Sequence, residues 1–156
     1  MKPQFTTSGN AFIEQVQAGL IAPGSPECAW IFACFPAFGT GSFAIQFLAG
    51  DSPVLLVRKW NPTTRSAFPL GVHLYDLNQI TYNERTITLS EQDLPWIAKM
   101  VESDWTVKKS DGIMLDGVEY AFISGEKNIR WKFIDSLSPG LEEVLDRLCR
   151  LAGVLR

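Results

Sequence analysis

Histidine, cysteine and serine side chains are the groups of this chain that could form a nucleophilic site. His73 is the only histidine, and Cys28, Cys34 and Ser66 are nucleophiles that the fold could bring to it. An imidazole activates a thiol or hydroxyl by taking its proton, and Asp76 could orient the imidazole. Such a set would suit a small hydrolase or transferase. No local motif accompanies these residues, so we expect His73 to have a structural or incidental role.

The cysteines also lack the spacing of a metal site. Zinc takes four ligands, or three and a water, from Cys, His or carboxylate side chains. Cys28, Cys34 and Cys149 include no Cys-x-x-Cys pair. On one continuous strand Cys28 and Cys34 would lie about 20 Å apart, too far for a disulfide. We expect buried free thiols in a reducing compartment, and neither a metal nor a cofactor.

A glycine-rich segment offers a second possible chemistry. The run Gly39-Thr40-Gly41-Ser42-Phe43-Ala44 matches the loose form of the dinucleotide-binding fingerprint. That fingerprint needs a helix N-terminus after the glycines to receive the pyrophosphate. Here Phe43, Ile45 and Phe47 alternate with the period of a strand. The segment therefore favours a hairpin turn over a nucleotide site.

Composition predicts one folded domain that spans residues 1–156. Hydrophobic residues make up 46% and charged residues 20% of the 156 residues, which is typical of globular chains. The net charge of -3, with both signs interspersed, provides no basic face for nucleic acid. The apolar run at 28–38 is too short to span a bilayer. We expect a cytoplasmic protein that binds neither nucleic acid nor membrane; its oligomeric state stays open.

Hydrophobic periodicity predicts an α+β fold. We expect a mainly antiparallel sheet of about six strands, with an N-terminal helix at 10–20, a central helix at about 91–102 and a C-terminal helix at about 139–153 packed on it. Residues 28–60 have the pattern of three consecutive antiparallel strands. Val118, Tyr120 and Phe122 should pair with Ile129, Trp131 and Phe133 across a glycine-containing turn. Ser138 and Pro139 form the start signal of the last helix.

Trp60 is the aromatic residue that we expect at a binding surface. The chain has five tryptophans, and most should be buried in the core. Trp60 ends a predicted strand beside Arg58 and Lys59, and it precedes a polar loop bounded by Pro62 and Pro69. Loops on rigid scaffolds often carry binding residues. The alternative is an aromatic residue packed beneath its own loop.

An acidic segment could attract a basic partner. Between residues 75 and 104 the acidic residues outnumber the basic ones, Arg85 and Lys99; they are Asp76, Glu84, Glu91, Asp93, Glu102 and Asp104. Complementary charge raises the rate at which two proteins meet. A solvated surface would have the same composition.

The C-terminal third resembles a known kind of protein. The segment from Leu115-Asp116-Gly117-Val118-Glu119-Tyr120 to Trp131, followed by the helix at 139–153, resembles the ending of small bacterial α+β proteins, some of which look like immunity proteins of toxin-delivery systems. The resemblance implies a binding module that neutralises a toxin by occluding it. It transfers no binding residue to this chain.

These observations favour a non-enzymatic binding protein with a protein partner, and the resemblance implies one of the immunity type. Its expected binding residues are Trp60, Arg58, Asp76, Glu84, Glu91 and Asp93. Two alternatives stay open. One is the small hydrolase or transferase with a dispersed site around His73, and the other is a small-ligand domain with an apolar pocket, which would also use the aromatic residues.

Overall fold

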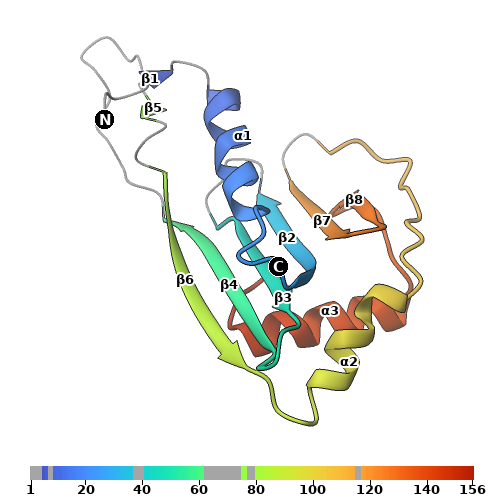
Figure 1. The fold of residues 1–156 in the computed structure, drawn as a ribbon. Helices are drawn as coiled ribbons and strands as arrows, with labels where there is room; N and C mark the ends of the chain where they lie inside the picture. Colours follow the sequence, from blue (N-terminus) through green and yellow to red (C-terminus); the bar gives the residue numbers. More distant parts are fainter. Residues whose placement is uncertain (1–4, 7–8, 37–40, 62–74, 77–79, 115–116) are drawn as a thin grey trace.

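The sheet of this protein carries helices on both of its faces (Figure 1). The computed structural model describes residues 5–6, 9–36, 41–61, 75–76, 80–114 and 117–156. The elements are β1 (Phe5–Thr6), α1 (Gly9–Leu20), β2 (Cys28–Pro36), β3 (Phe43–Leu48), β4 (Val54–Asn61), β5 (Tyr75–Asp76), β6 (Thr81–Thr88), α2 (Leu94–Ala98), the 3-10 helix η2 (Lys99–Glu102), β7 (Val118–Ser124), β8 (Asn128–Lys132) and α3 (Pro139–Ala152). The predicted α+β fold is confirmed.

The main sheet has six antiparallel strands in the order β6-β4-β3-β2-β7-β8, and β1 pairs separately with β5. The meander predicted at 28–60 is β2, β3 and β4. The hairpin β7–β8 has the predicted pairing, with Tyr120 opposite Trp131 and Phe122 opposite Ile129. None of the described helices is long and apolar enough to cross a bilayer.

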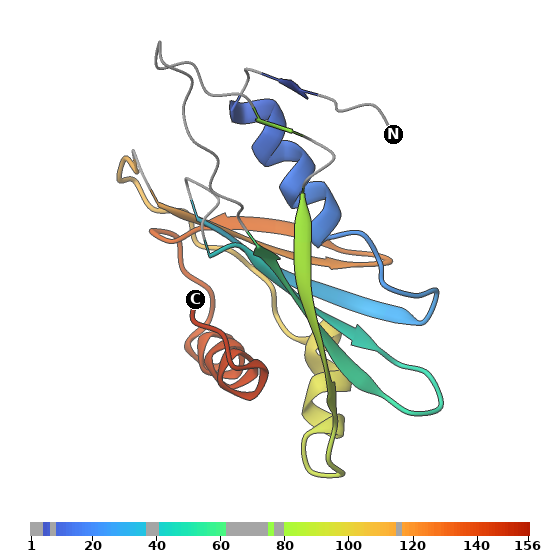
Figure 2. The ribbon, with the colours of Figure 1, turned by 90° about the vertical axis from the view of Figure 1, so that its left-hand side faces the viewer.

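Helices α2 and α3 lie on one side of the sheet (Figure 2). Aromatic side chains fill the core between the sheet and these helices. Trp30 of β2 contacts Phe47 and Phe122, with ring centroids 5.8 and 5.7 Å away. Trp105 stacks on Phe122 at 3.8 Å. From α3, Leu141, Leu145, Leu148, Cys149 and Ala152 are buried in the same cluster, as the helical spacing of its leucines predicts. This core is therefore built from one face of the sheet and one stripe of α3.

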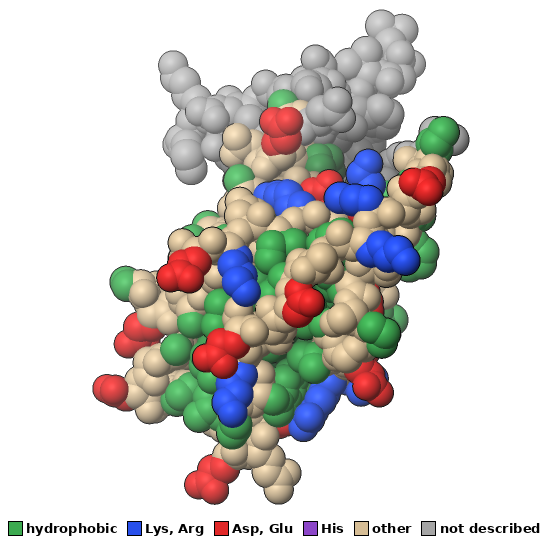
Figure 3. All heavy atoms as spheres, turned by 90° about the vertical axis from the view of Figure 1, so that its right-hand side faces the viewer, with side chains coloured by type: hydrophobic (Ala, Val, Ile, Leu, Met, Phe, Trp, Pro, Cys, Tyr) green, Lys and Arg blue, Asp and Glu red, His purple; other side chains and the backbone are tan. Residues whose placement is uncertain are grey.

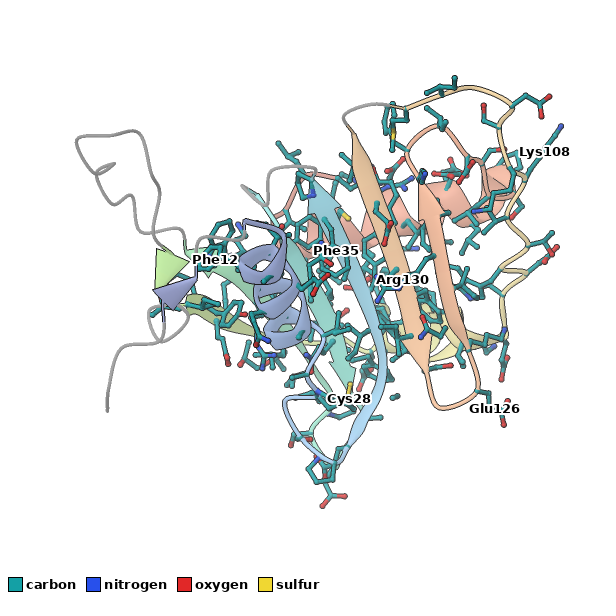
Figure 4. All side chains as sticks on the ribbon, turned by 90° about the horizontal axis from the view of Figure 1, so that it is seen from above. Phe12, Cys28, Phe35, Lys108, Glu126 and Arg130 are labelled. Atoms are coloured by element: carbon teal, nitrogen blue, oxygen red, sulfur yellow. The ribbon has the colours of Figure 1, made fainter. Side chains whose placement is uncertain are left out.

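Helix α1 covers part of the opposite face (Figure 4). Val16 and Leu20 are fully buried there against small side chains of the central strands, among them Ala33 and Ala44. Small residues let the helix approach the sheet closely. Beyond α1 in this view, Arg130 of β8 lies over the ring of Phe35 at 5.9 Å.

Buried polar side chains of the sheet hold the end of α1. Gln46, with no exposed surface, accepts from the Gly24 amide at 2.7 Å and donates to the Ala22 carbonyl at 2.8 Å. Arg58 donates to the carbonyls of Gly19 and Ala22 at 2.7 and 2.9 Å. The last carbonyls of a helix have no partner within the helix, so these side chains satisfy them.

Gly19 is required where α1 meets β6. A β-carbon at this position would overlap the ring of Tyr82. The hydroxyl of Tyr82 donates to the Val16 carbonyl at 2.8 Å, so the ring cannot move away without losing that bond. Glycine thus permits the close contact between helix and strand.

The central helix is shorter than the predicted 91–102. Ser90 accepts from the Asp93 amide at 3.1 Å, in the manner of the predicted start signal, but α2 ends at Ala98 and continues only as η2. The indole of Trp30 donates to the Ile97 carbonyl at 3.0 Å. The indole of Trp105 donates to the Met100 carbonyl at 2.9 Å. Tertiary hydrogen bonds therefore take carbonyls that a longer helix would use itself.

Helix α3 begins and ends at residues suited to those positions. Ser138 accepts from the Leu141 amide at 3.4 Å, and Pro139 occupies the first turn. Gly153 has a φ of 70°, in the left-handed region, and its amide donates to the Arg150 carbonyl. This turn ends the helix and directs the chain back along it.

The anchoring role of Arg58 predicts a loss of stability in the variant Arg58→Met. The variant leaves the Gly19 carbonyl and Glu84 without this donor and the Ala22 carbonyl with Gln46 alone, so we expect the free energy of unfolding to fall by about 1–3 kcal/mol. The matched control is Lys59→Met, because Lys59 is an exposed neighbour on the same strand. This variant should change the free energy of unfolding by less than about 0.5 kcal/mol. Urea unfolding measures both, and equal effects would contradict the anchoring role.

Candidate functional site

A pocket of about 210 Å³ opens between the hairpin β7–β8 and helix α3. It combines aromatic side chains with charges of both signs. Its lining residues are Tyr120, Trp131, Phe133, Asp135, Glu142, Asp146 and Arg156. The pocket is therefore not the apolar cavity that one of the sequence-based alternatives requires.

Arg156 forms one wall of this pocket. The left-handed turn at Gly153 brings Arg156 back to α3, where its guanidinium pairs with Glu142 and with Asp146. The Arg156 Nε to Asp146 Oδ1 distance is 2.8 Å, and the guanidinium lies over the Tyr120 ring at 5.5 Å. Burial alone would lower the pKa of Arg156, but the two carboxylates outweigh it and raise the pKa. The guanidinium therefore stays charged and held in place.

Tyr120 and Trp131 supply polar atoms that have no hydrogen-bond partner among the described residues. The indoles of Trp30, Trp96 and Trp105 each donate to a protein oxygen, at distances of 2.9–3.0 Å. The Tyr120 hydroxyl and the Trp131 indole have no such bond to any residue that the structure describes. No side-chain nitrogen or oxygen in that part of the chain is both closed off from solvent and unpaired. The two groups must therefore reach solvent, and the pocket is the opening that both residues line.

The Tyr120 hydroxyl is a hydrogen-bond donor at neutral pH. Burial raises the pKa of Tyr120 to about 12, and the neighbouring Cys34 thiol contributes to the rise. The group stays protonated over the physiological range, so it can donate as well as accept.

Asp135 fixes the opposite wall. Its carboxylate accepts from the backbone amides of Lys132 and Ser110, at 2.9 and 3.0 Å, and from Lys109 Nζ at 3.4 Å. The Lys132 and Ser110 amides, with Lys109, lower the pKa of this carboxyl group, although burial opposes them. Asp135 is therefore a charged, fully engaged side chain that ties the segment at 108–112 to the end of β8.

Large hydrophobic side chains surround the opening. Phe133 is 66% exposed and lines the pocket, although its alternation with Trp131 predicts an inward-facing residue. Ile113, 89% exposed, lines a second depression of about 340 Å³ that shares Asp135 with the first. Leu155, 94% exposed, precedes Arg156. On the face that carries residues 103–114, hydrophobic side chains lie between charges of both signs (Figure 3).

Trp60, Arg58 and Glu84 lie on the α1 side of the sheet, away from this pocket. Trp60 is half-buried and meets the ring of Phe12 edge-on, with centroids 5.8 Å apart. Arg58 is only 8% exposed and pairs with Glu84 at 3.1 Å. Arg58 therefore anchors a helix, and it presents little charge to a partner.

The other expected binding residues lie beyond the two ends of β6. Asp76 belongs to β5, ahead of β6, and its side chain lies outside the described residues. Glu91 and Asp93 follow the far end of β6, an eight-residue strand roughly 25 Å long. Asp93 accepts from the Trp96 indole at 3.0 Å and pairs with Arg147 at 3.4 Å. The structure does not bring the six expected residues together.

The nucleophilic site considered from the sequence is only partly described. His73 and Ser66 lie outside the described residues. Cys28 is half-buried, and burial raises its pKa. Cys34 is buried, and burial raises its pKa to about 12. A protonated, buried thiol is a poor nucleophile, so Cys34 does not suit this role.

The carboxylates of the pocket do not form a metal site. Among the described residues, no three His, Cys, Asp or Glu side chains converge in a way that could hold a metal ion. Glu142 and Asp146 instead surround a guanidinium, which already neutralises part of their charge.

No protein-family model, curated protein or solved structure matches this chain. The site is therefore interpreted from its own geometry. Sequence reasoning missed it because its wall residues Asp135 and Arg156 carry no motif. The one signal was the hairpin pairing, which places Tyr120 beside Trp131.

The buried thiols predict a loss of stability in alkaline solution. Burial raises the pKa of Cys34 and of Cys149 from 9.0 to about 12. Unfolded thiols ionise above 9.0 whereas the folded ones stay protonated, so the stabilisation present below that pH is lost as the pH rises toward 12. Each thiol can lower the free energy of unfolding by at most about 1.4 kcal/mol per pH unit.

Urea unfolding between about pH 8 and about pH 11 measures this dependence. The variant Cys149→Ala lacks one of the two thiols and should show a shallower decline. A free energy of unfolding that stays constant or increases above pH 9 would contradict the assignment.

Proposed function

We propose that this chain is a non-enzymatic binding protein of the immunity type, which neutralises a toxin or effector by direct contact. The observation that carries the proposal is Phe133, an aromatic side chain 66% exposed that lines a pocket together with Tyr120 and Trp131, whose polar atoms bond to no described residue. Aromatic side chains beside well-formed pockets are the usual anchors of protein interfaces. The contact surface in this proposal is the end of β8 together with Arg156 and the segment at 109–114.

Exposed hydrophobic side chains at this end support a protein partner over a small ligand. Ile113, Phe133 and Leu155 are the large hydrophobic residues that stand exposed in the described part of the chain. Phe133 lines the first depression and Ile113 lines the second, while Leu155 is next in the chain to Arg156, which lines the first. Clustered exposed hydrophobic residues with a charged surround are typical of interaction surfaces.

The state of the polar groups favours binding over catalysis. The carboxylates of Glu142 and Asp146 are both paired with the guanidinium of Arg156, and Asp135 is saturated by donors. Cys34 lies behind Tyr120 as a protonated thiol. We place the protein in the cytoplasm, where its three free thiols would stay reduced.

Co-purification from the native cell tests the proposal. The wild-type chain should retain one protein at equal stoichiometry, with the product of a neighbouring gene as the first candidate. Phe133→Ser should weaken retention by at least about thirtyfold, which corresponds to the roughly 2 kcal/mol of an interface hot spot. The free energy of unfolding of the Phe133→Ser variant should change little, because the Phe133 side chain is exposed.

Glu91→Ser is the control, because Glu91 is an exposed residue of the acidic segment that lines neither depression. It should retain the partner as well as wild type does. Loss of the partner in Glu91→Ser, with retention in Phe133→Ser, would place the contact on the acidic segment instead. Recovery of no stoichiometric protein would refute the binding function.

A further inference from the structure

The pocket beneath Phe133 is the opening through which two polar groups of nearly buried residues reach solvent. Tyr120 and Trp131 are only 4% and 2% exposed, yet the hydroxyl of one and the indole of the other bond to no described residue. Burying such groups without hydrogen bonds is costly, so proteins pair nearly all of them. Neither group is closed off from solvent here, so a molecule that enters the pocket can take the place of solvent as their hydrogen-bond partner.

The charges around the pocket favour a cationic occupant. Asp135 faces Lys109 and two backbone amides, which leaves little charge uncompensated. Glu142 and Asp146 share the single guanidinium of Arg156, so this pair retains an excess of one negative charge. Asp146 is 52% exposed at its side chain, and its contact with Arg156 uses Oδ1, which leaves Oδ2 open to an incoming donor.

The size of the pocket limits what can enter. About 210 Å³ lies below the roughly 300–1,000 Å³ of pockets that hold cofactors and drug-sized ligands. It is sufficient for one side-chain head group. The exposed ring of Phe133 at the rim can stack on the stem or the charge of that group, because a cation is attracted to an aromatic face.

We propose that the pocket receives a lysine or arginine side chain of a partner protein; this rests on the binding function proposed above. The cationic head pairs with the open Oδ2 of Asp146, and the Tyr120 hydroxyl accepts one of its hydrogen bonds; both oxygens of Glu142 already accept, from Leu137 and from Arg156. The Trp131 indole is a donor only, so it needs an oxygen acceptor. A carbonyl of the segment that carries the basic side chain supplies it. A free alkylamine lacks such an oxygen, which distinguishes a partner side chain from a free polyamine.

Titration with small probes tests the proposal without the partner. The probe is Nα-acetyl-arginine amide, its neutral isostere is Nα-acetyl-citrulline amide, and spermidine represents a free polyamine. The readout is the indole N–H signal of Trp131 in a two-dimensional ¹⁵N–¹H NMR spectrum, assigned by its disappearance in Trp131→Phe. The arginine probe should shift this signal in a saturable way, and the citrulline probe should not.

Two variants locate the contacts. Asp146→Asn removes the open carboxylate and should lower the affinity for the arginine probe by about two- to fivefold, the range for an exposed ion pair. Tyr120→Phe removes a hydroxyl that bonds to no described residue, and it should lower the affinity for the arginine probe by about two- to tenfold. Glu143→Gln is the control, because Glu143 is an exposed carboxylate on the same helix that does not line the pocket. It should leave the affinity unchanged.

The outcomes separate this inference from the proposed function. No shift of the Trp131 signal, an equal shift with the citrulline probe, or tighter binding of spermidine would overturn the basic side chain as occupant. An effect of Glu143→Gln equal to that of Asp146→Asn would overturn the assignment to this pocket. A protein partner recovered in the co-purification would still support the binding function in each of these cases. Specific binding of the arginine probe, with no protein partner, would refute the binding function and retain the cation site.

Discussion

The burial of the two central strands on both faces is the constraint on which the architecture depends. Along β2 the side chains of Trp30, Phe32 and Cys34 enter the core beneath α3, while Ile31, Ala33 and Phe35 enter the cluster beneath α1. Strands of this kind need a covering layer on each side. On the α1 side, α1 is the helix that covers the sheet in the described part of the chain. Its end is held by hydrogen bonds from Gln46 and Arg58 in addition to apolar contacts. Gln46 and Arg58 thereby make their hydrogen bonds within the fold, whereas the Tyr120 hydroxyl and the Trp131 indole near Arg156 bond to no described residue.

The sequence predicted the elements that local spacing determines. The hairpin of β7 and β8 was recognisable because side chains alternate in a strand, and α3 because its leucines share one helical face. The central helix was overestimated because indoles from distant positions bond to its carbonyls, which spacing does not reveal. Phe133 shows the same limit. Alternation fixes the side of the strand on which its ring lies, but the extent of the cover above that side depends on where α3 passes.

The candidate site was beyond sequence reasoning for a related reason. Tyr120 and Trp131 become neighbours through strand pairing, and the predicted pairing implied that contact. Arg156 reaches them only because Gly153 adopts a left-handed conformation that reverses the chain. Arg58 shows the opposite case, since a basic residue beside Trp60 suggested a binding surface, and the carbonyls at the end of α1 instead enclose it. Whether a charged side chain serves the fold or the surface depends on these long-range partners.

The edge strand β6 has a consequence for self-association. Among the strands that the structure describes, β6 has β4 as its neighbour on one side and none on the other. Two copies could pair their β6 strands edge to edge, antiparallel, around a two-fold axis at the middle of the strand. Glu84 of one copy would then lie opposite Glu84 of the other, or Arg85 opposite Arg85. Like charges directly opposite each other weaken strand pairing. The alternating charges at the centre of this strand thus discourage two molecules from joining their sheets into one.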